Sequence, residues 1–294
     1  MNAVVVIDKP SGFTSHDVVN RVRRIMGQRA VGHLGTLDPS ATGVLPIVLG
    51  NLTRLAQFYA HSEKTYEGAI RFGFATDTYD AEGESTTTPQ AVDLHIDVLR
   101  ALAARFQGTI EQMPPPFSAK KVAGVPAYKL ARKNKPVTLQ PVQVEIKEFE
   151  ILSTTADQAS FRARVASGTY IRSIAHEMGQ RLGCGAHLCS LRRTSVAEFA
   201  IADAHSLQEL EAAMQQGTVE SVFIHPRKLV PQLPCVTATE EAVNLIRSGR
   251  SVNLPEMSRA PQIKVFYGQR DLIAIATRVA GTLFHPRIVF STTE

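Results

Sequence analysis

The sequence contains few cysteines and no long hydrophobic run. Its three cysteines, Cys184, Cys189 and Cys235, form a sparse and odd set that fits a reducing compartment, so we expect a cytoplasmic protein. A structural zinc site needs four ligands in paired spacing, and Cys184 and Cys189 have no second pair, so we expect no metal. The apolar run at residues 44–49 is interrupted by Pro46 and is far too short to cross a membrane.

The opening residues lack a basic leader. They reach Asp8 early, and the apolar run before it favours a first β-strand over a secretory signal. Acidic residues are missing from residues 112–144, which carry six lysines and arginines. With the arginines at residues 21–29 and a net charge of +5, this basic stretch is suited to a phosphate backbone, although a charge run is more often a solvated face.

Lysine is missing between Lys9 and Lys64, which excludes a Walker-type phosphate loop in the glycine-rich stretch at residues 32–50, GHLGTLDPSATGVLPIVLG. The glycines allow positive φ and let a ligand approach the backbone closely. Asp38 is the only acidic residue within residues 18–62. Taken alone, Asp38-Pro39 predicts a turn in which the aspartate side chain bonds to its own backbone.

The whole stretch changes that interpretation, because it resembles the signature of the TruB family, the tRNA pseudouridine-55 synthases. Three later segments resemble further motifs of the family: KTYEG at residues 64–68, GTYIRS at 168–173 and LCSLRRTS at 188–195. The resemblance covers nearly all of residues 2–200. It implies a pseudouridine synthase fold and a reaction that needs no cofactor.

In that family the aspartate matching Asp38 is the catalytic carboxylate. Isomerisation breaks the N1–C1′ bond of uridine and joins C5 to C1′; a carboxylate can attack C1′, stabilise an oxocarbenium-like state or remove a sugar proton, and the sequence leaves these roles open. The resemblance implies two further catalytic residues, Arg172, which pairs with Asp38, and Tyr66, which lies against the base. It places three more side chains around the flipped nucleotide: His33, Tyr170 and Leu191.

Four of these residues also have an ordinary structural interpretation. Tyr66 shares one face of a predicted strand with Ile70, as a core aromatic would. Leu191 alone would be assigned to core packing, and Arg172 to an exposed helix position. His33 would be a loop residue whose ring caps backbone groups.

The basic stretch resembles the RNA-gripping insertion of the family, at about residues 113–140. Its predicted RNA-binding residues are Lys120, Lys121, Lys129, Arg132 and Lys133. By contrast, residues 76–88 are polar and acidic and predict a solvent-exposed loop.

The remaining pattern predicts an α+β fold with a mixed, largely antiparallel central sheet. Helices are expected between residues 14 and 27, 94 and 108, 171 and 182, 206 and 216, and 240 and 249. Strands are expected at residues 4–7, 65–74, 142–151 and 161–165, with short strands after residue 262. We expect a catalytic domain at residues 1–230 and a small β-rich domain at residues 231–294 that looks like the PUA-type RNA-binding domain.

The resulting prediction is an enzyme that converts uridine 55 in the T arm of tRNA to pseudouridine, as a monomer without a protein partner. One alternative is an RNA-binding or RNA-folding protein without essential catalysis. Another is an enzyme that acts on a different uridine or within a guide-directed complex. The basic stretch and the PUA-like tail would serve any of these functions.

Overall fold

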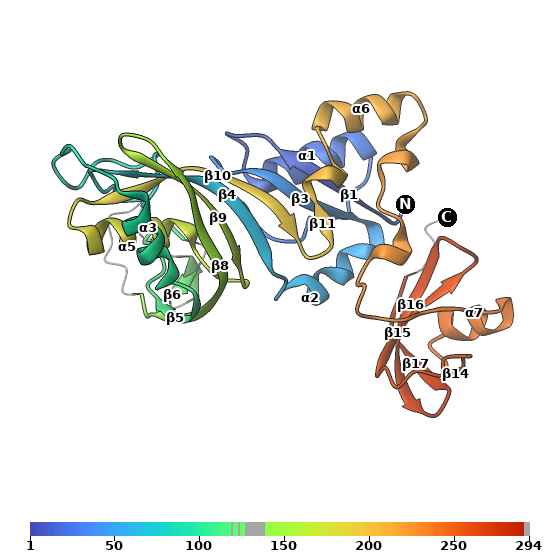
Figure 1. Ribbon diagram of the computed structural model, residues 1–294. Helices are drawn as coiled ribbons and strands as arrows, with labels where there is room; N and C mark the ends of the chain where they lie inside the picture. The colour runs from blue at the N-terminus through green and yellow to red at the C-terminus, as the bar shows by residue number, and fades with distance from the viewer. Residues whose placement is uncertain (119, 123, 127–138, 291–294) are drawn as a thin grey trace. The chain divides into compact units, whose positions relative to one another are not determined.

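The computed structural model describes residues 1–118, 120–122, 124–126 and 139–290 (Figure 1). The chain forms two compact units. The first comprises Met1–Asp38, Val44–Ala60 and Glu198–Glu294, and the second comprises Pro39–Gly43 and His61–Ala197. No helix in the described part of the chain has both the length and the apolar character that a membrane span requires.

The N-terminal part of the first unit is a sheet packed against two helices. Its strands run in the order β12–β1–β3, with β12 parallel to β1 and β2 antiparallel to β3. Apolar residues of α1 and α6 share one core with β1 and β3. The elements are β1 (Ala3–Lys9), α1 (Ser15–Met26), β2 (Val31–His33), β3 (Thr42–Leu49), α2 (Ala56–Tyr59), β11 (Phe199–Ala200), β12 (Ala204–His205) and α6 (Leu207–Gln215).

Local sequence explains where α1 begins and ends. Thr14 accepts a hydrogen bond from the backbone N–H of Asp17, and the Asp17 carboxylate accepts one from the N–H of Thr14, which together form a capping box. The helix ends at Gly27, which has a φ of 59°. Ser15 is the first residue of α1, so this cap also fixes the position of the Ser15 hydroxyl, which bonds to Leu37 in the glycine-rich stretch.

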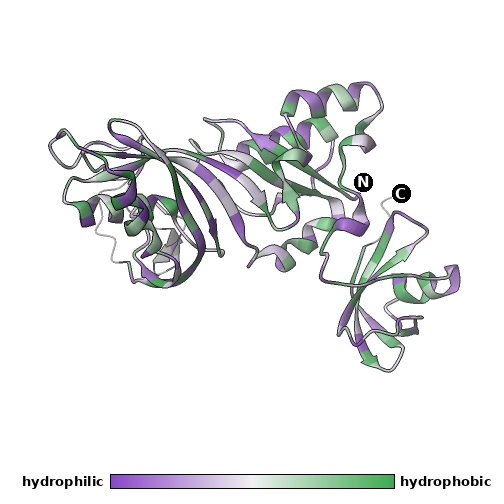
Figure 2. Cartoon of the chain, viewed as in Figure 1, coloured by the Kyte–Doolittle hydropathy of each residue, from purple (hydrophilic) through white to green (hydrophobic). Residues whose placement is uncertain are grey.

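The C-terminal part of the first unit is a separate five-stranded sheet in the order β13–β15–β16–β17–β14. Only β13 and β15 pair in parallel; the other pairs of this sheet are antiparallel. Apolar residues of β15 and β16 (Figure 2) pack with those of α7 into one core. The elements are β13 (Cys235–Thr237), α7 (Glu240–Arg247), β14 (Val252–Asn253), β15 (Gln262–Tyr267), β16 (Asp271–Ala280) and β17 (Leu283–Val289).

The second unit is an antiparallel sheet in the order β10–β4–β9–β8–β5. Helix α3 packs on β8 and helix α5 packs on β10. The first two residues of β3, Thr42 and Gly43, pair in parallel with Arg192 and Arg193 of β10. The elements are β4 (Lys64–Phe72), α3 (Ile96–Ala104), β5 (Gly108–Gln112), β6 (Lys121–Val122), β7 (Val125–Pro126), β8 (Val142–Thr154), β9 (Gln158–Val165), α5 (Ile171–Leu182) and β10 (Ala186–Val196).

The predicted α+β fold with a mixed, largely antiparallel sheet is confirmed, and the expected helices correspond to α1, α3, α5, α6 and α7. The prediction that residues 76–88 form a solvent-exposed loop is confirmed for residues 81–88, which are mostly exposed, and is wrong for Thr76 and Asp80. Thr76 and Asp80 are only 2% and 6% exposed. The reason is a backbone contact, because Leu188 of β10 donates to the Tyr79 carbonyl and accepts from the Ala81 N–H, at 2.9 and 3.0 Å.

Candidate active site

Asp38 lies in the loop between β2 and β3, and residues beside it hold that loop. The hydroxyl of Ser15 accepts a hydrogen bond from the Leu37 N–H at 2.8 Å and contacts the Leu37 carbonyl at 3.2 Å. The Leu34 N–H donates to the Pro46 carbonyl at 2.9 Å, and both leucines are buried. The half-buried carboxylate of Asp38 is therefore carried on a fixed backbone rather than on a mobile tip.

His33 is the last residue of β2, where it pairs with Ile47 of β3. Its ring is half-buried. The sequence left it open whether His33 belongs to a loop or to the site of a nucleotide. The structure places it on a strand, immediately before the loop that carries Asp38.

Tyr66 and Leu191 lie on one face of the β4–β10 pair. Tyr66 is directly opposite Arg193, and Leu191 is directly opposite Gly68. Because side chains two residues apart on a strand point the same way, Tyr66 and Leu191 occupy diagonal positions on that face. Tyr66 is 7% exposed and Leu191 is half-buried. The sheet thus brings together two of the side chains that the sequence assigned to the base.

Positive charge is concentrated at this end of β4. Arg193 is fully buried and hydrogen-bonded to the Tyr66 hydroxyl. Burial, and then the charge of Arg193, lower the pKa of Lys64 to about 8. Arg193 thus lies buried directly opposite Tyr66 rather than exposed to solvent.

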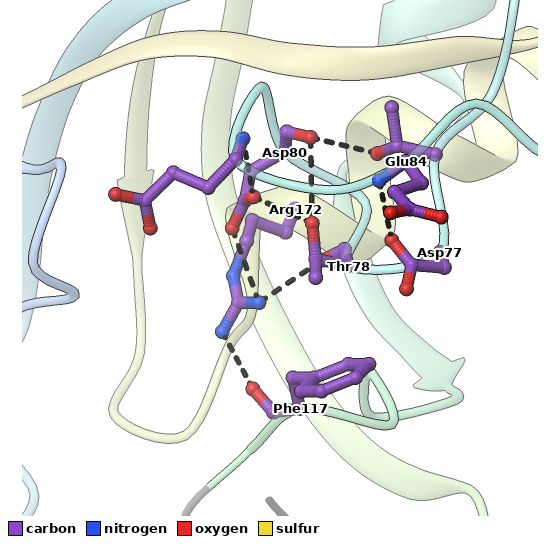
Figure 3. A network of polar contacts seen from close by, with 8 residues as sticks. Asp77, Thr78, Asp80, Glu84, Phe117 and Arg172 are labelled. Carbon is purple, nitrogen blue, oxygen red and sulfur yellow. Dashed lines mark hydrogen bonds and ion pairs between the residues drawn. The ribbon is translucent and has the colours of Figure 1, made fainter. Parts of the chain in front are cut away.

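Arg172 is held in a buried polar network (Figure 3). Its guanidinium lies 3.3 Å from the Asp80 carboxylate, and both side chains are less than one tenth exposed. It also donates to the backbone carbonyls of Thr78 and Phe117, each at 3.0 Å. Arg172 is therefore not an exposed helix residue, because its planar group is fixed from several directions.

Asp80 is the residue of this network that the sequence did not reveal. It accepts hydrogen bonds from the Thr78 hydroxyl at 2.6 Å and from the Glu82 N–H at 3.1 Å. Asp77, Glu82 and Glu84 surround it in the sequence, and charge pattern alone does not distinguish the one carboxylate that becomes buried. The side chain of Asp80 is singled out by a contact between this loop and β10, in which Asp80 pairs with Leu188.

Tyr170 is positioned by a buried glutamine. The Gln112 side chain accepts from the Tyr170 N–H at 2.8 Å and donates to the Tyr170 carbonyl at 3.1 Å. Gln112 is 1% exposed, so this clamp is shielded from water. It fixes the residue immediately before α5, and with it the start of the helix that carries Arg172.

Asp38 belongs to the first unit, whereas Tyr66, Tyr170, Arg172 and Leu191 belong to the second. The pairing of Asp38 with Arg172 therefore stays a prediction.

Of the predicted RNA-binding residues, Lys120 is exposed and Lys121 begins β6. Lys129, Arg132 and Lys133 lie outside the described residues. Within the described ranges, no group of three or more His, Cys, Asp or Glu side chains is arranged to hold a metal ion.

Comparisons with known proteins give a consistent result. The model of the TruB family pseudouridylate synthase N-terminal domain matches residues 23–171, and that of the tRNA pseudouridylate synthase B C-terminal domain matches residues 172–233. A tRNA pseudouridine synthase B from Solibacter usitatus (strain Ellin6076) is 46% identical and covers 98% of this chain and 100% of its own. One from Dehalococcoides mccartyi (strain ATCC BAA-2266 / KCTC 15142 / 195) is 38% identical, with 99% and 97% covered.

Among solved structures, the chain is similar to one described as a Cbf5–Nop10–Gar1 complex. The TM-score is 0.72 at 25% identity, and the match covers 98% of this chain and 85% of that chain.

Proposed function

This chain belongs to the TruB family of pseudouridylate synthases, and from that premise we propose that it converts uridine 55 in the T-loop of tRNA to pseudouridine. It is an enzyme, an isomerase that forms pseudouridine in tRNA. The observation that carries the finer proposal is the loop around Asp38. It presents a half-buried carboxylate on a backbone that is held by Ser15 and by buried leucines.

In this proposal Asp38 acts at C1′ of the target ribose, as an anion that either attacks C1′ or removes a ribose proton. Arg172 pairs with Asp38 and fixes the orientation of its carboxylate. Tyr66 and Leu191 hold the base against the β4–β10 face, and Tyr170 and His33 contact the flipped nucleotide. The diagonal placement of Tyr66 and Leu191 and the fixed guanidinium of Arg172 support these roles.

We propose that the RNA contacts extend beyond the reacting base. Lys120, Lys121, Lys129, Arg132 and Lys133 would grip the T arm. Residues 231–294 would act as a PUA-like RNA-binding domain after a catalytic domain at residues 1–230. The enzyme would work as a monomer without a protein partner, and the sparse cysteines support a cytoplasmic reaction.

Tritium release from a T-arm hairpin labelled at uracil C5 tests the reaction directly. Forming the C5–C1′ bond sends that hydrogen to water, so each turnover releases one label. We expect release by the wild-type chain and none above background from Asp38→Asn, with hairpin binding retained.

The matched control is Asp157→Asn, which removes a carboxylate from a half-exposed pair with Arg71. This variant should release tritium at the wild-type rate. Turnover by Asp38→Asn would refute the role of Asp38. A wild-type chain that releases label only from a different hairpin would refute the choice of uridine 55.

A further inference from the structure

Arg193 is a fully buried arginine for which the proposed mechanism has no role. Its side chain is among the largest in the described chain with essentially no exposed surface. Burying a guanidinium is costly, and buried arginines are retained where specific contacts compensate. Tyr66, a residue assigned to the target base, provides such a contact.

The backbone around Arg193 is held from both sides. On one side, Arg193 pairs with Tyr66 in the antiparallel β10–β4 ladder. On the other, it pairs with Gly43 in the parallel β10–β3 ladder. An added Cβ on Gly43 would lie only 2.2 Å from the Arg193 carbonyl oxygen, so the two strands approach too closely for any side chain there. The backbone of Arg193 is therefore fixed, and its side chain lies on the same face of the sheet as the phenol of Tyr66.

The positive charge of Arg193 affects the pKa of a neighbouring lysine. Burial lowers the pKa of Arg193, but a guanidinium stays protonated in proteins. The same charge contributes, after burial, to the lowered pKa of Lys64 on β4. Arg193 is therefore a permanent cation in a poorly screened environment.

Hydrogen-bond roles decide what this cation does to Tyr66. Arginine has five N–H donors and no acceptor, so the phenol oxygen must accept the bond between them. The phenol proton then points away from Arg193. We propose that Arg193 is a positioning residue that holds Tyr66 as a hydrogen-bond donor toward the target uracil. This inference rests on the proposed function, because it presupposes that Tyr66 contacts the base.

A double-mutant cycle between Arg193→Met and Tyr66→Phe tests the coupling. Methionine replaces the cation with an apolar side chain that can remain buried, and phenylalanine removes only the hydroxyl. We expect each single variant to lower kcat about tenfold or more with KM within about threefold of the wild-type value. In the double variant, kcat should fall no more than about threefold below the lower single variant, because both changes remove one interaction.

Arg193→Lys provides a second variant if methionine prevents folding. Lysine keeps a charged donor. With Tyr66 present, Arg193→Lys should therefore have a higher kcat than Arg193→Met. In Tyr66→Phe, the two Arg193 variants should have the same kcat. The matched control is Arg162→Met, which removes an exposed arginine bonded to Glu67 on β4. It should leave kcat unchanged.

The outcomes separate the two proposals. A wild-type chain without tritium release refutes the proposed function and this inference with it. An active wild-type chain whose Arg193 and Tyr66 variants reduce kcat independently, so that their effects multiply, refutes the positioning role alone.

Discussion

The buried pair of Arg172 and Asp80 shows how much one residue depends on another far away in the sequence. Asp80 lies in a loop that is polar throughout, yet it is enclosed because that loop bonds to β10. A buried cation and carboxylate stabilise the fold only when both are present, since removal of one leaves the other in a medium that solvates it poorly. The pair is thus a point where a small change has a large effect.

Asp80→Asn should lower the free energy of unfolding by about 3 kcal/mol, because it keeps the side-chain shape but removes the carboxylate facing a buried guanidinium. Urea unfolding followed by circular dichroism at neutral pH measures the change. Asp157→Asn is the control, since its pair with Arg71 is about 40% exposed and a surface pair contributes about 1 kcal/mol or less. Equal losses in both variants would contradict the prediction.

At the scale of elements, the contact between β3 and β10 is the feature that most constrains the glycine-rich stretch. Gly43 has a φ of 101°, a region that other residues rarely adopt, and it faces the backbone of Arg193. The sequence showed that this stretch allows close approach to a ligand. In the structure, the group that approaches Gly43 is a neighbouring strand.

Gly43→Ala should destabilise the protein by about 3 kcal/mol or more, since left-handed strain adds to a clash that forces β3 and β10 apart. Gly217→Ala is the matched control, because Gly217 follows α6 with a φ of 71° and has open space where its Cβ would be. Only strain operates there, at about 1 kcal/mol. Urea midpoints measured for both variants test this difference, and similar shifts would show that the clash is unimportant.

Elements with local signals were predictable from the sequence. Helix α1 follows from the Thr14–Asp17 capping box and Gly27, and in α5 the apolar residues at helical spacing, Ile171, Ile174, Ala175 and Met178, are buried. The buried state of Asp80 was not predictable, because it depends on pairing with β10 more than one hundred residues later. The contact between Arg193 and Tyr66 has the same origin: strand register, which a single sequence specifies only weakly across such separations.

The residues of the candidate site show the same difference between local sequence signals and contacts with distant segments. About a dozen matching positions around Asp38 carried the family resemblance, because they lie close together in the sequence. The partners of Tyr66, Tyr170 and Arg172, namely Arg193, Gln112 and Asp80, come from other segments, and no local pattern indicates which side chain each of them meets. Sequence therefore identified the residues assigned to substrate but not the residues that hold them.

At the scale of the whole molecule, charge distribution governs the encounter with RNA. The net charge is only +5, so a general attraction to anions is weak, and in the proposed function the basic stretch at residues 112–144 supplies local contacts. Binding through phosphate contacts releases counterions, and each contact adds to the dependence of affinity on salt. The slope of log K for tRNA against log salt concentration therefore reports the number of phosphate contacts, which a single affinity does not.

Lys120→Ala should reduce the slope of log K against log salt concentration by about one unit and leave kcat unchanged, because it removes an exposed cation that we propose contacts one phosphate. Filter binding of tRNA between low and physiological salt measures the slope. The control is Lys147→Ala, a lysine already paired with Glu63, whose carboxylate raises the lysine pKa and offsets its charge. That variant should keep the wild-type slope. If both variants lower it equally, net charge rather than contact by Lys120 controls binding, and the assignment of the basic stretch to the T arm would lose its support.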